Sequence, residues 1–313
     1  MTHAVLVSSI HVMKTPSRTA LLASLAFGLA ASAAFASEPA KKHILLLAGT
    51  PSHGPGQHEH NAGMLLFKKC LDASGLPLET TAHLNAEWPS AKELATADTI
   101  VFYCDGGPGH FLLKNDRLAQ VAREMKRGAG FVCLHYGVEF PKDKGGPQAL
   151  AWMGGYFEAD WSVNPTWTAD FGPLPHHPVS NGVKPFSSRD EWYFHMRFAD
   201  PAGGKLTPIL SAVPPESTMS RKDGPHEGNP TVRAEVAAGK PQVTAWAYER
   251  PDGGRGFGFT GGHYHQGWGN DNQRTLVLNA IVWTAHAKVP AGGVASHVTA
   301  ADLSANLDPK GRK

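Results

Sequence analysis

The chain has 313 residues, of which 42% are hydrophobic and 18% are charged, and its formal net charge is +2. These values are ordinary for a globular protein with enough apolar material for a core. No cluster of lysine and arginine stands out, so no nucleic-acid partner is expected.

The first 36 residues have the pattern of a signal peptide. Lys14 and Arg18 precede a run of small apolar residues at 20–35, and Ala34-Phe35-Ala36 matches a cleavage site before Ser37. The run is too short to cross a bilayer comfortably, because a spanning helix needs ~20 apolar residues. We therefore expect a secreted or periplasmic protein that is not inserted in the membrane after cleavage. Met13 is an alternative start.

Apolar runs alternate with helical patterns after the signal peptide. The predicted strands are 43–48, 99–104 and 131–134, and the predicted helices are 61–73 and 116–127. Strands that alternate with amphipathic helices indicate βαβ units and a parallel sheet. In such sheets, ligands bind at the carboxyl ends of the strands.

The segment 141–240 is rich in proline and glycine, and we interpret it as an elaboration of a single domain. Short strands are predicted there at Trp167–Phe171, Trp192–Phe198 and Thr207–Ser211. A strand pair follows at Val243–Tyr248 and Gly256–Thr260, joined by a turn that is typical of a hairpin.

A helix is predicted at about 273–286, near the end of the domain. The tail at 291–313 is expected to be loosely ordered. The three cysteines of the mature chain, Cys70, Cys104 and Cys133, are odd in number and lie in apolar contexts, which favours buried free thiols over disulfides.

Histidines gather in the polar loops that follow the predicted strands. Histidine is the most frequent metal ligand, and the fold class should bring these loops to one edge of the sheet. The candidate metal ligands are His53, His58, His60, His135, His263 and His265.

Several known site motifs are absent. His58-Glu59-His60 is not the zinc-protease pattern H-E-x-x-H, because position 62 is alanine. The chain has no dinucleotide-binding fingerprint, no P-loop and no G-x-S-x-G elbow, so no nucleotide cofactor is expected.

The segment from Gly130 to Gly137 resembles the strand and sharp turn that carry the cysteine nucleophile of class I glutamine amidotransferases. Here His135 would occupy the tip of the turn, and Cys133 would lie two residues back within the strand. His263-Tyr264-His265 stands where that class has a catalytic His-x-Glu. This resemblance implies an old scaffold whose thiol chemistry is replaced by metal or acid/base chemistry.

Six stretches of the chain carry a second resemblance: 43–63, 101–110, 130–137, 154–171, 188–198 and 254–283. Through them the chain as a whole resembles the ThuA-like (trehalose utilisation) family. The resemblance implies one domain at 37–290 with an amidotransferase-like, flavodoxin-like three-layer α/β fold, and a role in carbohydrate utilisation that includes oxidised (keto) glycosides.

A divalent metal, zinc first, is the leading hypothesis for the histidine group, since zinc takes three or four N/O ligands. The alternative is that these histidines only hydrogen-bond loop backbone or sugar hydroxyls. The sequence does not separate His58 from His60.

Acid/base catalysis is assigned to Glu191, His195 and, more weakly, Asp105. On a strand, Glu191 and His195 would lie on the same face. A surface strand with an ion pair to a neighbouring arginine is the alternative. Tyr264 and Trp268 are the expected sugar-packing aromatics, together with Tyr136 beside His135.

Three functions remain open at this point. The first is an exported, metal-assisted enzyme that acts on a small carbohydrate by hydrolysis, elimination or isomerisation. The second is a non-catalytic periplasmic sugar-binding protein, and the third is a residual amidohydrolase that uses Cys133. A homo-oligomer is compatible with each of them.

Overall fold

The computed structural model describes residues 40–200 and 203–310. The chain divides into two units, residues 1–38 and 39–313, and every described residue belongs to the second. The expected signal peptide therefore lies outside the described residues, and export stays a prediction. None of the described helices is both long enough and apolar enough to cross a membrane.

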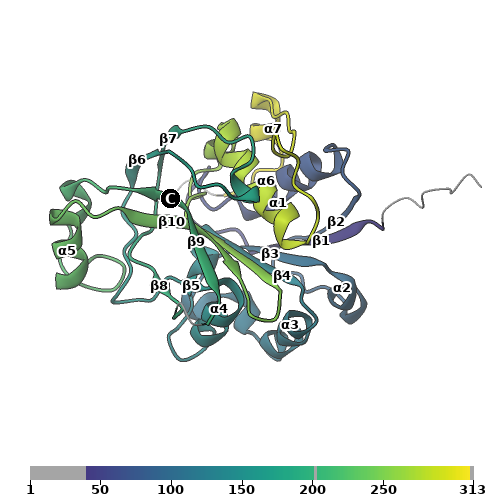
Figure 1. The fold of residues 1–313 in the computed structure, drawn as a ribbon, viewed down its shortest axis with the longest axis horizontal. Coiled ribbons are helices and arrows are strands. Elements are labelled where there is room, and N and C mark those ends of the chain that lie inside the picture. The colour runs from purple at the N-terminus through teal and green to yellow at the C-terminus, as the bar shows by residue number, and fades with distance from the viewer. Residues whose placement is uncertain (1–39, 201–202, 311–313) are drawn as a thin grey trace, which may run out of the picture. The chain divides into compact units, whose positions relative to one another are not determined.

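A seven-stranded sheet forms the centre of this unit (Figure 1). Its order is β2-β1-β3-β4-β11-β10-β9; the neighbours from β2 to β11 are parallel, and β10 is antiparallel to β11 and to β9. The 2-1-3-4 order is typical of flavodoxin-like sheets and confirms the predicted α/β class. The strands are β1 (Lys42–Ala48), β2 (Leu78–His83), β3 (Thr99–Tyr103), β4 (Gly130–Leu134), β9 (Lys205–Ala212), β10 (Gln242–Glu249) and β11 (Arg255–Phe259).

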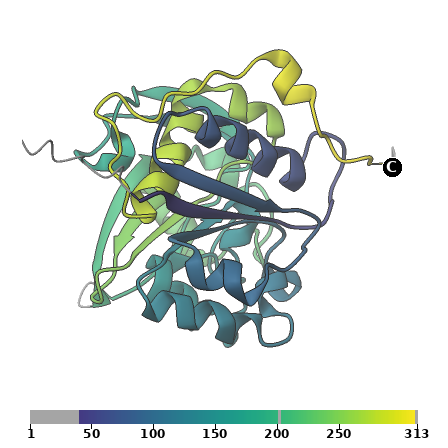
Figure 2. The ribbon, with the colours of Figure 1, turned by 90° about the vertical axis from the view of Figure 1, so that its right-hand side faces the viewer.

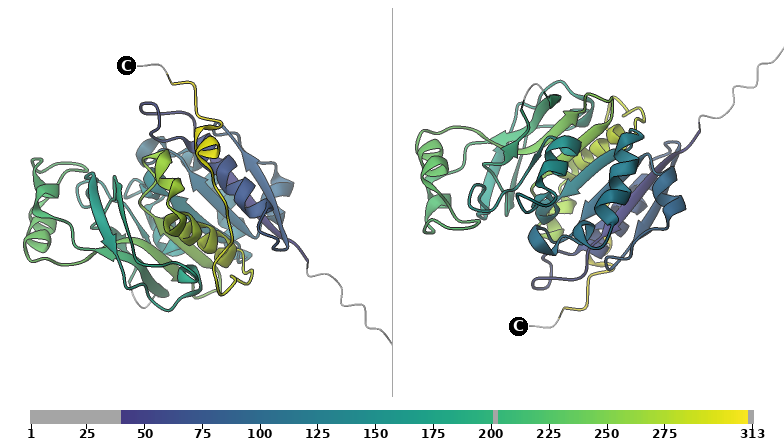
Figure 3. Two further views of the ribbon diagram at one scale, coloured as in Figure 1. Left: turned by 90° about the horizontal axis from the view of Figure 1, so that it is seen from above. Right: turned by 90° about the horizontal axis from the view of Figure 1, so that it is seen from below.

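Helices cover both faces of the sheet, as Figure 2 and the opposite views of Figure 3 show. Ile44 and Leu46 of β1 belong to one core cluster, and Leu45 and Leu47 belong to the other. Because both faces are buried, the strand is a continuous apolar run rather than an alternating one. The helices are α1 (His60–Asp72) and α6 (Asp271–Thr284) on one face, and α2 (Ala91–Thr96), α3 (Arg117–Lys126) and α4 (Gly146–Met153) on the other.

The chain between α4 and β10 forms the predicted elaboration. It contains two small antiparallel pairs, β5 with β8 and β6 with β7, and one further helix. These elements are β5 (Gly155–Tyr156), β6 (Trp167–Phe171), β7 (Phe186–Asp190), β8 (Arg197–Phe198) and α5 (Pro230–Ala237).

The prediction of a strand at Trp192–Phe198 is wrong over most of its length, because only Arg197–Phe198 pairs as a strand. Trp192 and Phe194 are buried in the core cluster that also holds α6, and Tyr193 is buried in the other cluster. His195 then has a φ of +57°, which ends the extended run.

The described part of the C-terminal tail contacts the domain, a feature that the expectation for 291–313 did not include. Helix α7 (Ala300–Ser304) begins with a capping box between Thr299 and Asp302. Leu303 is buried, and Lys69 of α1 donates to Asp302 at 2.5 Å. The tail is therefore fixed on α1 through contacts that are distant in sequence.

Candidate metal centre

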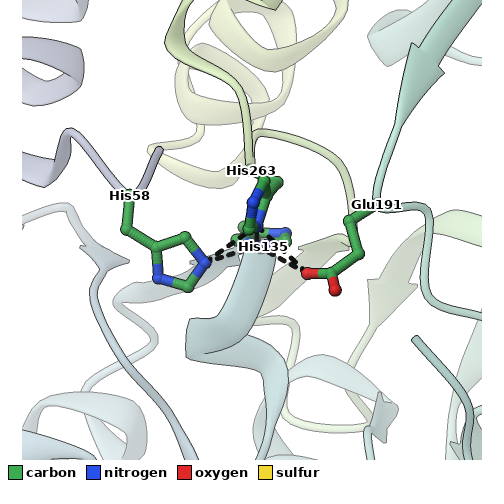
Figure 4. Close-up of side chains that lie close together, drawn as sticks. All are labelled: His58, His135, Glu191 and His263. Carbon is green, nitrogen blue, oxygen red and sulfur yellow. Dashed lines mark hydrogen bonds and ion pairs between the residues drawn. The ribbon is translucent and has the colours of Figure 1, made fainter. Parts of the chain in front are cut away.

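The loops that follow several strands meet at the carboxyl edge of the sheet. His58 lies in the loop after β1, His135 directly follows β4, and His263 comes four residues after β11. Glu191 directly follows β7 and approaches from the elaboration (Figure 4). These four side chains offer ligand atoms that lie within 4.8 Å of one another.

The three histidine nitrogens form a tight triangle. His58 Nε2 lies 3.1 Å from His135 Nε2 and 3.0 Å from His263 Nδ1, and the third side measures 3.3 Å. Ligands that surround a tetrahedral zinc at 2.0–2.1 Å are about 3.3–3.4 Å apart. The spacing of the triangle therefore fits a metal bound by all three nitrogens.

Hydrogen bonds fix the tautomers of two of these histidines. His58 Nδ1 donates to Asp105 Oδ1 at 2.8 Å, and His135 Nδ1 donates to the Thr260 carbonyl at 2.8 Å. Because a carboxylate and a carbonyl can only accept, both Nδ1 atoms carry the proton and both Nε2 atoms present lone pairs.

The Nε2 lone pairs of His58 and His135 face each other in the protein interior. Burial, followed by the neighbouring histidines, lowers the pKa of His58 and of His135 well below the ordinary value, so both rings are neutral at pH 7. Two lone pairs at 3.1 Å repel each other, and a cation between them would remove that repulsion. A divalent cation satisfies them together, and this is the strongest evidence that the residues suit a metal.

Glu191 supplies a carboxylate to the same group. Its Oε2 lies 3.1 Å from His263 Nδ1 and 3.6 Å from His135 Nε2. Three imidazoles and one carboxylate are a ligand set that suits zinc and related divalent metals.

Asp190, which sequence analysis did not select, positions two of these ligands. It is fully buried and accepts hydrogen bonds from the backbone N–H groups of Gly262 at 2.7 Å, His263 at 3.1 Å and Glu191 at 2.8 Å. Burial raises its pKa to about 6, against the effect of these bonds. Its position one residue before Glu191 was the only sequence signal.

The turn at His135 has the form expected from the amidotransferase resemblance. Strand β4 ends at Leu134, and His135 adopts a φ of +51°, a left-handed conformation that is uncommon outside glycine. Cys133 is buried within β4, and burial raises the pKa of its thiol well above the usual range. The thiolate chemistry of a residual amidohydrolase has no support in this geometry.

Three of the six predicted histidine ligands meet with Glu191 at this centre, and His53 forms a second group with His58 and Asp105 whose ligand atoms also lie within 4.8 Å of one another. His60 is buried and its Nδ1 donates to the Thr50 carbonyl at 3.0 Å, with its Nε2 3.9 Å from Asp105. His265 is buried and neither of its ring nitrogens has a hydrogen-bond partner in the described structure. His53 is exposed and stacks on His58 with ring centroids 3.6 Å apart. His60 and His265 therefore belong to the packing around the centre.

The prediction that Glu191 and His195 share a face is wrong, because the segment between them is not a strand. His195 instead stacks on Trp161 at 4.2 Å, and its Nδ1 bonds the Trp161 carbonyl at 2.9 Å. His195 Nε2 lies 3.7 Å from Glu235. The structure thus separates His195 from the candidate centre, whereas Asp105 supports His58.

Of the three aromatic candidates, Trp268 does not face solvent. Its indole is 0% exposed and packs on Phe67 and Tyr103, with ring centroids 4.8 and 6.1 Å away. The glycine-rich sequence around it suggested an open loop, but a short 3₁₀ turn directs the ring into the core. Tyr264 is partly buried against His263, and Tyr136 lines the pocket next to the centre.

That pocket has a volume of about 210 Å³. His53, His58, Tyr136, Glu191 and Tyr193 line the side near the centre, and the Tyr193 hydroxyl lies 3.2 Å from His135 Nε2.

The elaboration also lines the pocket with residues that sequence analysis missed. They include Asn164, Arg221, His226 and Glu227. Arg221 donates to Asn164 at 2.8 Å, and His226 Nε2 pairs with the buried Glu139 at 2.9 Å. The hydrogen bond to Glu139 raises the pKa of His226. No motif marked these residues, since only the tertiary fold brings them to the pocket.

Comparisons with known proteins agree with this architecture. Two solved structures of ThuA-like proteins are similar to the chain: one from Bacteroides uniformis ATCC 8492 (18% identity, TM-score 0.53, covering 81% of this chain and 94% of that one) and one from Parabacteroides merdae ATCC 43184 (15%, 0.54, 83% and 94%). At these identities the likeness shows the fold alone. No curated protein matches the chain. The family model described as "ThuA: Trehalose utilisation" matches residues 43–284, and the chain therefore belongs to the ThuA family.

Proposed function

We propose that this protein is an exported, divalent-metal-dependent enzyme that acts on a small carbohydrate. Membership of a trehalose-utilisation family indicates a carbohydrate-related function. The main support for a metal is the pair of Nε2 lone pairs of His58 and His135, which lie 3.1 Å apart. The hydrogen bonds of the two Nδ1 atoms to Asp105 and to the Thr260 carbonyl fix the tautomers that direct these lone pairs toward each other. Zinc is the first candidate, because it favours imidazole and carboxylate ligands.

A metal bound here would polarise a sugar carbonyl or activate water, which serves hydrolysis, elimination and isomerisation alike. The chain's own residues would prepare that chemistry. Glu191 completes the ligand set or accepts a proton, because its Oε2 is 3.1 Å from His263 Nδ1. The Tyr193 hydroxyl, whose pKa burial raises well above the usual range, stays protonated and can donate to a substrate oxygen.

The pocket is suited to a polar ligand of sugar size. Asn164, Arg221 and Glu227 offer an amide, a guanidinium and a carboxylate to the pocket. Such groups hydrogen-bond hydroxyls, and a site that makes these bonds discriminates strongly between sugars. Keto-glycosides suit a site that combines a Lewis acid with a neutral tyrosine.

The first test is the metal content of the purified mature protein. We expect one equivalent of a divalent transition metal, which is lost in His135→Ala and in His58→Ala. His297→Ala is the matched control, because His297 is exposed and lies outside the pocket lining. A folded wild type that neither contains a metal nor binds added Zn²⁺ would contradict the proposal.

Activity is then tested on trehalose-like glycosides and their keto derivatives, with loaded and metal-free protein. Turnover that requires the metal supports an enzyme. Sugar binding without turnover, equally strong in metal-free protein, would instead identify a sugar-binding protein.

A further inference from the structure

The C-terminal segment reaches back to the loop that carries His58. Lys310 lies 3.3 Å from Glu59 Oε1 and also donates to the Gln57 carbonyl. The Asp308 N–H donates to Glu59 Oε2 at 2.8 Å, and Asn61 donates to Asp308 at 2.7 Å. In Figure 2 the yellow C-terminal segment passes over α1 and ends beside this loop.

The ion pair between Glu59 and Lys310 is buried. The Glu59 side chain is 1% exposed and that of Lys310 is 5% exposed. A charge at such a place is strongly unfavourable once its partner is removed, because water no longer solvates it. The loop conformation that buries Glu59 therefore depends on the tail.

Glu59 is the neighbour of His58 and holds the loop from one side. Its Oε1 accepts from the Gly56 N–H at 2.8 Å. On the other side, the His58 N–H donates to the His263 carbonyl at 3.0 Å, and the His265 N–H donates to the Gly56 carbonyl at 2.9 Å. His58 itself has a φ of +45°, a conformation that persists only where its surroundings enforce it.

We propose that Glu59 and Lys310 are positioning residues for the metal centre, and that the segment around 308–310 is a strap that fixes the His58 loop. This inference rests on the proposed function for its metal. The strap lies beyond residue 284, where the family match ends. Neither residue touches the ligand triangle; both act through the backbone on either side of His58.

The experiment compares Lys310→Met with the matched control Lys69→Met in the full chain. Lys69 also ties the tail to α1, but through an exposed pair with Asp302 at 2.5 Å that is remote from the His58 loop. The first readout is amide hydrogen exchange at residues 56–60 in metal-free protein, and the second is the Zn²⁺ dissociation constant from chelator competition.

We expect Lys310→Met to speed exchange at residues 56–60 and to weaken Zn²⁺ binding roughly tenfold, as loss of a supporting residue does. Lys310→Arg should restore both values in part, and Lys69→Met should change neither. A folded Lys310→Met protein with wild-type exchange and wild-type affinity overturns the proposal.

The experiment also covers a Lys310→Met variant that does not fold and a wild type that binds no metal. If Lys310→Met does not fold, the double variant Glu59→Gln/Lys310→Met removes both buried charges and takes its place under the same criteria. If the wild type binds no metal, the proposed function fails, while faster exchange at 56–60 in Lys310→Met still supports the strap and unchanged exchange still overturns it.

Discussion

Removing the carboxylate behind His58 should weaken metal binding without unfolding the chain. Asp105 Oδ1 accepts from His58 Nδ1 at 2.8 Å and from the Ser52 hydroxyl at 2.8 Å. Asparagine keeps the size of the side chain but carries no charge, so in Asp105→Asn the imidazole is less basic and its tautomer is less firmly fixed.

The magnitude follows from the exposure of this bond. Partners of metal-bound histidines typically contribute about 10- to 100-fold to affinity, or about 1.4 to 2.8 kcal/mol. The Asp105 side chain is 32% exposed, whereas His58 is 1% exposed, so solvent screens part of the interaction. We therefore expect a loss near the lower limit, roughly tenfold.

The assay is Zn²⁺ competition with a chromophoric chelator at fixed pH and salt, with thermal unfolding as the check on folding. Asp72→Asn is the control, because Asp72 forms an exposed pair with Lys68 at the end of α1. An affinity of Asp105→Asn within about twofold of wild type would refute the support of His58 by Asp105. A loss as large as that of His58→Ala would show that Asp105 is itself a ligand.

Acid should destabilise the metal-free protein, because burial holds the pKa of His58 and His135 below the ordinary 6.5. The unfolded chain then takes up protons first, so this stability is present above pH 6.5 and is lost as the pH falls below it. Urea unfolding at several pH values should show that the free energy of unfolding depends less steeply on pH in His58→Ala than in the wild type, and an equal dependence would contradict the assignment. Cys133→Ala should keep metal binding and any activity while losing about 1 kcal/mol of stability. A variant that retains the metal but has no activity would support a thiol mechanism instead. Trp268→Ala should lose about 3–5 kcal/mol in denaturant unfolding, since a fully buried indole is removed. Trp268→Phe should leave sugar binding unchanged, and a selective loss of binding would return Trp268 to the pocket.

The sheet was predictable because its signals are local. The strand predicted at 43–48 is observed at Lys42–Ala48, and the one at 99–104 at Thr99–Tyr103. Each is a short apolar run that is buried on both faces. The hairpin of β10 and β11 also agrees, because its turn residues specify the reversal.

The membership of the candidate site was less predictable, because it depends on tertiary contacts. His58 and His60 lie two residues apart, yet one faces the centre and the other begins α1. Between the strand and α1 the chain takes a backbone φ of +45° at His58, which composition does not reveal.

The pocket residues from segment 141–240 could not be predicted for a related reason. Arg221 and His226 lie in a segment without hydrophobic periodicity, so no pattern placed them. Long-range bonds to Asn164 and Glu139 hold them there. The contacts of the tail were missed in the same way, because the burial of Lys310 depends on Glu59, which is far away in the sequence.

The wide separation of the ligands along the chain has a thermodynamic consequence. His58 and His263 are 205 positions apart, so a ligand triangle exists only after the sheet has assembled. Metal would then bind the native state and not the unfolded one. Above the dissociation constant, each tenfold rise in free metal should add about 1.4 kcal/mol to the apparent stability. The measured unfolding midpoint would thus depend on the free metal concentration of the medium as well as on the sequence of the protein.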